Sequence, residues 1–215
     1  MPTRALVFDF DGTLADTESA VLQSWRELFL DHGVELPMEA WYAVIGTQHT
    51  TPAMFSLLAE HVPGIDPEAL RPKTKARVFE LLDELGPREG VRTYLEDARQ
   101  RGLKLAVASS SSGAWVNPHL DRLGIAPYFD AVLTGDLHKA KPDPDLYLAA
   151  LDALGTTAEE TIAFEDTPHG VTSAKAAGLT CVAVPNAITE SLDFGQADVV
   201  LPAFTAKPLE ALLTR

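Results

Sequence analysis

The sequence predicts an α/β protein, a parallel sheet with helices on both faces, interrupted near its N-terminus by an all-helical insertion. From about Val91 onward, helical and strand patterns alternate, which is typical of parallel strands joined by crossover helices. Between Thr17 and Gly86 no strand pattern occurs. The apolar run from Ala5 to Phe8 precedes that block and has the character of a strand buried on both faces, so we expect it to join the later sheet.

The insertion consists of amphipathic helical segments. Residues Thr17 to Gly33 carry apolar side chains at helical spacing, and the glycine suits the end of a helix. The segment from Glu68 to Leu85 has the same pattern. The sequence therefore predicts two domains, a core of residues 1–16 and 87–215 and a helical domain of residues 17–86.

The alternating part of the chain is punctuated by glycines that suit helix ends. The predicted helices are Arg92–Arg101, Trp115–Leu123, Asp145–Leu154 and Val171–Ala177. The predicted strands are Leu103–Ala108, Ala131–Thr134, Thr161–Phe164 and Thr180–Val184, with Asp198–Leu201 as an edge strand.

Composition excludes several classes of protein. The net charge of −14 and the scattered lysines and arginines argue against a nucleic-acid partner. No stretch approaches the roughly 20 apolar residues that span a bilayer, so we expect no membrane contact. The N-terminus has no signal-peptide layout and the chain has a single cysteine, Cys181, which we interpret as a small buried hydrophobic residue. The expected location is the cytoplasm.

Polar side chains follow the predicted strands at the point where each one ends. Asp9 and Asp11 follow the first strand, Ser109 and Ser110 the second, Lys141 lies in the loop beyond the third, and Glu165 and Asp166 follow the fourth. Ligands of open parallel sheets bind just beyond the carboxyl ends of the strands. The sequence therefore predicts one site at this edge of the sheet.

The residue types at that edge indicate a metal and a phosphoryl group. Four carboxylates would repel one another without a cation, and all-oxygen ligation with no His or Cys nearby favours Mg²⁺. Lys141 supplies a positive charge to a carboxylate and to an incoming phosphate. The serine run from Ser109 and the backbone N–H of Gly12, which we expect to be open to an anion, suit a phosphoryl group.

The two aspartates of the first motif suit covalent catalysis. An ionised carboxylate bound to a metal can attack phosphorus and form an aspartyl phosphate, and Asp9, at the strand end, is the predicted nucleophile. Asp11, on the turn, is the predicted general acid and base.

These motifs resemble a known superfamily. Asp9-x-Asp11-Gly12-Thr13, Ser109, Lys141-Pro142 and Glu165-Asp166 are similar, in order, to the four motifs of the haloacid dehalogenase superfamily. The stretch from Val171 to Pro185 resembles its β-phosphoglucomutase-like branch. The resemblance implies a Rossmann-like core with a helical cap inserted after the first motif.

The resemblance also implies roles for the motif residues. Ser109 and Lys141 would bind the phosphoryl group. The metal ligands would be Asp9, the backbone carbonyl of Asp11 and Asp166, with Glu165 in support directly or through water.

The resemblance narrows the reaction as well. An aspartate at position 11 indicates phosphatase or phosphomutase chemistry, and mutases of this branch carry a histidine soon after the pair that is Asp16-Thr17 here. Val21 stands at the nearest matching position. We therefore expect a Mg²⁺-dependent phosphatase of small phosphorylated, sugar-phosphate-like metabolites. The alternatives are a sugar phosphomutase and, as a non-enzyme, a receiver-like phospho-signalling domain.

Candidate substrate contacts lie in both predicted domains. They are Gly12, Thr17, Ser110 and His49, the last in the stretch where the specificity loop of the cap would lie. The three tryptophans, Trp25, Trp41 and Trp115, are interpreted as core or interface aromatics. The expected partner is a small phosphorylated substrate, and the expected assembly is a monomer or a weak dimer.

Overall fold

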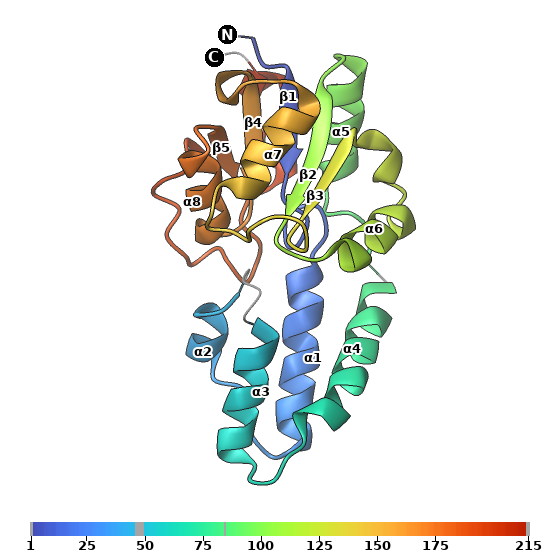
Figure 1. Cartoon of the computed structure of the whole chain (residues 1–215), viewed down its shortest axis with the longest axis vertical. Coiled ribbons are helices and arrows are strands. Elements are labelled where there is room, and N and C mark those ends of the chain that lie inside the picture. The colour runs from blue at the N-terminus through green and yellow to red at the C-terminus, as the bar shows by residue number, and fades with distance from the viewer. Residues whose placement is uncertain (1, 46–49, 84, 214–215) are drawn as a thin grey trace. The chain divides into compact units, whose positions relative to one another are not determined.

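The structure, a computed structural model, describes residues 2–45, 50–83 and 85–213. Its described strands form one parallel six-stranded sheet in the order β3-β2-β1-β4-β5-β6 (Figure 1). The strands are β1 (Ala5–Phe8), β2 (Lys104–Ser109), β3 (Ala131–Thr134), β4 (Thr161–Glu165), β5 (Thr180–Ala183) and β6 (Val199–Val200). The expected parallel α/β fold is confirmed.

The first strand lies inside the sheet, between two strands that come much later in the chain. In β1, Leu6 pairs with Leu105 of β2 on one side and with Ile162 of β4 on the other. From β1 the chain adds β2 and β3 toward one edge of the sheet, and from β4 it adds β5 and β6 toward the other edge. The direction of the strand order therefore changes between β1 and β4. Ligands bind at such a switch point in open α/β sheets, so the fold itself marks the carboxyl end of β1.

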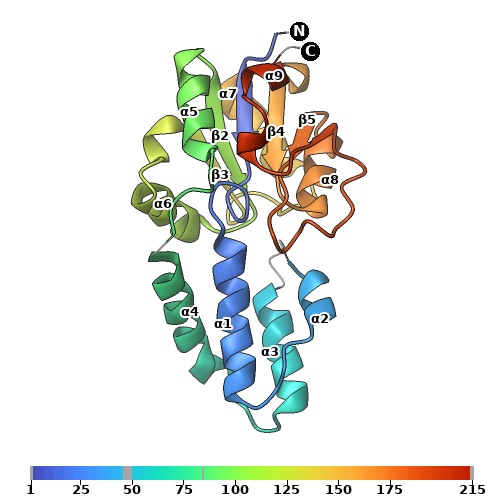
Figure 2. The same cartoon turned by 180° about the vertical axis from the view of Figure 1, so that it is seen from behind.

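Helices of the core cover both faces of the sheet (Figures 1 and 2). They are α5 (Val91–Gln100), α6 (Gly113–Arg122), α7 (Asp145–Leu154), α8 (Pro168–Ala176) and α9 (Glu210–Leu213), with 3-10 turns at Ala126–Tyr128, Ala158–Glu160 and Phe204–Ala206. Successive β1 side chains point to opposite faces. Leu6 and Phe8 pack with α5 and α6, whereas Ala5 and Val7 pack with α7 and α8.

The chain divides into two compact units, residues 1–15 with 86–215, and residues 16–85. The described secondary structure of the second unit is helical: α1 (Thr17–Asp31), α2 (Met38–Tyr42), α3 (Thr50–His61) and α4 (Pro67–Asp83). Within this unit Ser24 of α1 donates a hydrogen bond to the Thr74 carbonyl of α4 at 3.1 Å. Trp25 and Trp41 are buried, as expected for core aromatics.

Most elements begin and end within a few residues of their predicted bounds. The strand Ala131–Thr134 and the helix Asp145–Leu154 lie where the sequence predicts them. Cys181 is fully buried in β5, and burial raises the pKa of its thiol, so its interpretation as a small core residue is confirmed. Among the described helices, none combines the length and apolar character needed to cross a membrane.

An aromatic cluster holds the sheet to the helices on one face. The rings of Phe8 and Phe164 stack with centroids 4.7 Å apart, and Tyr94 of α5 meets Phe164 edge to face at 5.8 Å. Both phenylalanines are fully buried. The centre of the sheet therefore depends on close aromatic packing.

Replacing Phe164 with alanine should lower the free energy of unfolding by about 3–5 kcal/mol, because it removes a fully buried ring and leaves a cavity. Leu137→Ala is the control, since Leu137 is 78% exposed and its loss should change stability by less than about 0.5 kcal/mol. Urea unfolding followed by circular dichroism measures both. Equal effects of the two substitutions would contradict the packing described.

Candidate active site

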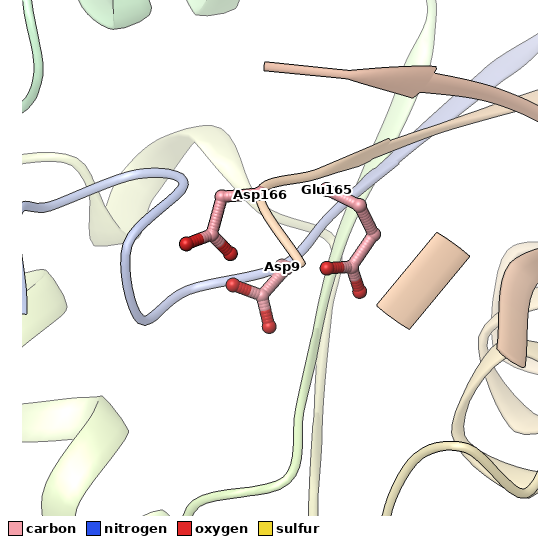
Figure 3. A group of neighbouring side chains, drawn as sticks. All are labelled: Asp9, Glu165 and Asp166. Carbon is pink, nitrogen blue, oxygen red and sulfur yellow. The ribbon is translucent and has the colours of Figure 1, made fainter. Parts of the chain in front are cut away.

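Three carboxylates gather at the carboxyl ends of β1 and β4 (Figure 3). Asp9 directly follows β1, Glu165 is the last residue of β4, and Asp166 follows it. One oxygen from each lies within 4.8 Å of the others, and all three residues are buried. Parallel pairing of the two neighbouring strands brings these side chains together from positions more than 150 residues apart in the sequence.

Lys141 supplies positive charge to two of these carboxylates. It lies in the loop between β3 and α7, and its Nζ is 2.6 Å from Asp9 Oδ1 and 2.5 Å from Glu165 Oε1. Burial by itself lowers the pKa of Lys141, but the charges of Asp9 and Glu165 outweigh it and hold the pKa above its ordinary value. Lys141 is therefore protonated at neutral pH.

Asp9 is only partly satisfied by its hydrogen bonds. Its Oδ1 accepts the Lys141 ammonium, whereas Oδ2 is buried and has no hydrogen-bond partner in the part of the chain that the structure describes. Burial raises the pKa of the Asp9 carboxyl, and Lys141 opposes that shift. Leaving a buried acceptor without a partner lowers stability by about 1–3 kcal/mol. A ligand that binds Oδ2 would remove this cost.

Asp166 is oriented by neutral donors, not by Lys141. Asn186 donates from Nδ2 to Asp166 Oδ2 at 2.8 Å, and the hydroxyl of Thr13 donates to Oδ1 at 3.3 Å. Gly12 lies against the same carboxylate, where an added Cβ would come within 2.0 Å of Oδ2. Its φ of +84° also favours glycine. The turn after β1 can therefore approach Asp166 only with glycine at position 12.

The expectation that the Gly12 N–H is open to an anion is wrong for this structure. That N–H donates to the carbonyl of Ala15 at 2.8 Å. The turn closes on itself, because Asp11 and Ala15 form a short bridge.

Glu165 is fixed by a tyrosine and a glycine that the sequence analysis did not select. The hydroxyl of Tyr147 in α7 donates to Glu165 Oε1 at 2.5 Å. Burial, followed by the charge of Glu165, raises the pKa of Tyr147 well above its ordinary value, so the hydroxyl keeps its proton. Gly170 of α8 leaves room for the carboxylate, since an added Cβ would lie 1.9 Å from Oε2.

Asp11 lies among donors from the serine run and α6. The indole N–H of Trp115 donates to Asp11 Oδ1 at 2.8 Å. The hydroxyl of Ser111 donates to Oδ2 at 2.6 Å, and that of Ser109 reaches the same oxygen at 3.4 Å. The interpretation of Trp115 as a core or interface aromatic is therefore incomplete, because its indole N–H contacts a candidate catalytic residue.

Of the remaining predicted substrate contacts, Ser110 and Thr17 lie in the part of the chain that the structure describes. The Ser110 hydroxyl oxygen accepts the backbone N–H of Lys141 at 3.1 Å, so it links the serine run to the lysine loop. Thr17 is the first residue of α1 in the helical unit, and its role as a substrate contact stays a prediction. His49 lies outside the described residues.

Some of the residues that the sequence analysis missed left a signal in the sequence. Asn186 follows β5 at the same edge of the sheet, so the rule that selected Asp9 and Glu165 applies to it as well. Trp115 and Tyr147 lie in the first turns of α6 and α7. Their polar atoms are single groups on otherwise apolar side chains, which a pattern of hydrophobicity does not reveal.

The donor set fits a hard divalent cation. Asp9, Glu165 and Asp166 offer only oxygen, the ligand type that Mg²⁺ prefers. Among their oxygens, Asp9 Oδ2 is buried and unpartnered among the described residues. Three carboxylates against the single ammonium of Lys141 leave an excess of negative charge in a buried place, which a divalent cation would offset.

Comparison with known proteins places the chain in a family. A family model described as haloacid dehalogenase-like hydrolase matches residues 6–184, which include all four strand-end motifs. The chain belongs to the haloacid dehalogenase-like hydrolases. The resemblance seen in the motifs is thereby confirmed.

Several known proteins are similar to this one over most of its length. YhcW of Bacillus subtilis (strain 168) is 38% identical over 212 residues, 98% of this chain and 96% of YhcW. Fructose-1-phosphate phosphatase YqaB of Escherichia coli (strain K12) is 34% identical over 181 residues, 83% of this chain and 95% of YqaB. The crystal structure of CbbY from Rhodobacter sphaeroides in complex with phosphate has a TM-score of 0.75 and 28% identity, over 95% of both chains.

Gly170→Ala should lower the free energy of unfolding by about 1–3 kcal/mol, because its Cβ would overlap Glu165, whose carboxylate Lys141 and Tyr147 hold in place. Helix propensity alone predicts the opposite sign, since alanine in a helix is about 1 kcal/mol better than glycine. Gly86→Ala is the control, as a Cβ there meets nothing within 4 Å. Thermal and urea unfolding measure both, and a stabilised Gly170→Ala variant would contradict the close packing.

Proposed function

We propose that this protein is a Mg²⁺-dependent phosphatase of small phosphorylated, sugar-phosphate-like metabolites that works through a phosphoryl group carried on Asp9. The observation that carries the proposal is the buried Asp9 carboxylate, which Lys141 binds on one oxygen while the other has no partner among the described residues. A carboxylate so placed can both hold a cation and attack phosphorus. The family and the phosphatase among the similar proteins indicate the same class, a phosphoric monoester hydrolase.

The similar proteins support the substrate class. YqaB is named for the hydrolysis of fructose 1-phosphate, and the CbbY structure contains phosphate. Both cover most of this chain. A phosphorylated sugar is therefore the first compound to test.

In the first half of the reaction, the Asp9 carboxylate attacks the phosphorus of the ester. A bond forms between an Asp9 oxygen and phosphorus, and the bond between phosphorus and the ester oxygen breaks. The leaving oxygen takes a proton from the Asp11 carboxyl and departs as an alcohol. Lys141 and the Ser109 hydroxyl bind the phosphoryl oxygens during this transfer.

In the second half, water attacks the phosphorus of the aspartyl phosphate and gives a proton to the Asp11 carboxylate. The bond between Asp9 and phosphorus breaks, which releases inorganic phosphate and restores the Asp9 carboxylate. Asp11 then carries the proton that the next ester needs, so the cycle closes.

Asp9, Asp166 and the backbone carbonyl of Asp11 would hold Mg²⁺, with Glu165 in support. When bound, the ion neutralises the carboxylates and polarises the phosphoryl oxygens toward attack. Asn186 and Thr13 keep Asp166 turned toward the other carboxylates, since both donate to it.

We predict that the protein releases phosphate from sugar phosphates in the presence of Mg²⁺ and that EDTA abolishes this release. The reason is that the buried excess of negative charge repels an incoming phosphate unless a cation offsets it. Phosphate release from a panel that includes fructose 1-phosphate, glucose 6-phosphate and 4-nitrophenyl phosphate is the measurement.

Three outcomes of these incubations, with the sugar products and the protein also analysed, would overturn the proposal. Full activity in EDTA would contradict the role of the metal. A product in which the phosphate has moved within the sugar, with none released, would identify a phosphomutase. A long-lived phosphorylated Asp9 without turnover of any ester would identify a signalling domain.

We also predict that Asp9→Asn lowers kcat by about four orders of magnitude or more, because an amide cannot serve as the nucleophile. Asp152→Asn is the matched control: it makes the same change on an exposed position of α7 and should leave kcat unchanged. Circular dichroism of both variants checks the fold. Appreciable Mg²⁺-dependent turnover by folded Asp9→Asn would contradict the assignment of the nucleophile.

A further inference from the structure

Among the described residues, two kinds of donor bind the two oxygens of Asp11. Oδ1 accepts the indole N–H of Trp115 at 2.8 Å. Oδ2 accepts the hydroxyl of Ser111 at 2.6 Å, with the Ser109 hydroxyl at 3.4 Å. An indole N–H can only donate, whereas a hydroxyl can donate or accept. Oδ1 is therefore held as an acceptor, and Oδ2 is the oxygen that can exchange a proton without losing its partner.

Both ends of the bond between Trp115 and Asp11 are anchored in the same aromatic group. The Trp115 ring meets the buried His119 ring edge to face, with centroids 4.4 Å apart. The His119 ring in turn lies against Phe10, at 6.3 Å and an interplanar angle of 19°. Phe10 is fully buried and directly precedes Asp11 in the chain. The indole is thus fixed relative to the backbone that carries the aspartate.

We propose that Trp115 is a positioning residue for Asp11, whose indole N–H holds Oδ1 so that Oδ2 faces the reacting ester oxygen during proton transfer. The inference rests on the proposed function, in which Asp11 protonates the leaving oxygen. Trp115 itself does not touch the phosphorus or exchange a proton. It reduces the orientations that the carboxyl can adopt, and so places the acid correctly in a larger fraction of the encounters with substrate.

A positioning role predicts an effect that depends on the leaving group. The constant kcat/KM reports the steps up to transfer of the phosphoryl group to Asp9. In that transfer 4-nitrophenolate departs readily without a proton, because it is weakly basic. Phenolate is more basic and gains more from the acid. The two esters are nearly the same in shape, so a general change in binding affects both alike.

The test is the ratio of the losses in kcat/KM that Trp115→Phe causes with phenyl phosphate and with 4-nitrophenyl phosphate. Phenylalanine keeps a ring against His119 and removes the N–H. We expect a loss of about tenfold or more with phenyl phosphate and of less than about threefold with 4-nitrophenyl phosphate, as general acid catalysis contributes about 10²–10⁴-fold in all. Equal losses with both esters, or no loss with either, would overturn the proposal.

The control substitution is Trp41→Phe. Trp41 is fully buried in α2, and its indole nitrogen has no hydrogen-bond partner among the described residues. The change therefore removes the same atoms without removing a hydrogen bond, and the ratio of losses should stay near one. A ratio for Trp41→Phe as large as that for Trp115→Phe would also overturn the proposal.

Two further measurements separate this inference from the proposed function. If the wild-type protein hydrolyses neither phenyl nor 4-nitrophenyl phosphate, nor any sugar phosphate, the proposed function itself is wrong. If the wild-type protein hydrolyses these esters and Asp11→Asn removes activity toward phenyl phosphate, Asp11 is established as the general acid. The ratio of losses for Trp115→Phe then decides the role of the tryptophan. Urea unfolding of Trp115→Phe shows whether the variant is folded under the assay conditions.

Ser111→Ala provides a second variant, because it removes the hydroxyl that donates to Oδ2 of Asp11. It should show the same dependence on the leaving group.

Discussion

Lys141 offsets part of the electrostatic repulsion among the carboxylates at the end of β1. Its ammonium lies between Asp9 and Glu165, at 2.6 and 2.5 Å, and is itself buried. Removing a lone carboxylate from water costs several kcal/mol, so carboxylates remain ionised in such a place only beside a cation. Asp166 is held by hydrogen bonds from Asn186 and Thr13 instead. The negative charge that Lys141 leaves unbalanced is the reason why these carboxylates fit a divalent cation.

The turn after β1 and the first turn of α8 both lie in close contact with this charge cluster. Gly12 and Gly170 lie where a methyl group would overlap the carboxylates of Asp166 and Glu165. These contacts, together with the hydroxyl of Tyr147, leave Glu165 little freedom to move. A side chain held in this way loses little conformational entropy when a ligand binds beside it. The contacts that pack the folded chain therefore also hold these carboxylates in place.

The two aspartates of the first motif lie in different surroundings, and these fit the different roles proposed for them. Asp9 is buried beside a fixed cation, so its carboxylate has one oxygen available for a metal or for phosphorus. Asp11 is surrounded by the N–H of Trp115 and by serine hydroxyls. Hydroxyls can follow the gain and loss of a proton by reversing their hydrogen bonds, whereas an ammonium group cannot. The surroundings of Asp9 therefore suit a nucleophile, and those of Asp11 suit an acid and base.

The sequence by itself determined the parallel α/β fold and the edge of the sheet where the site lies. Hydrophobic periodicity and glycine stops are local, and parallel strands bring their carboxyl ends to one edge whatever their order. Only the tertiary structure decided the hydrogen bonds, because these depend on how helices are rotated against the sheet. That rotation brings the Trp115 indole to Asp11 and the Tyr147 hydroxyl to Glu165. It was likewise the folded turn, not its composition, that committed the Gly12 N–H to Ala15.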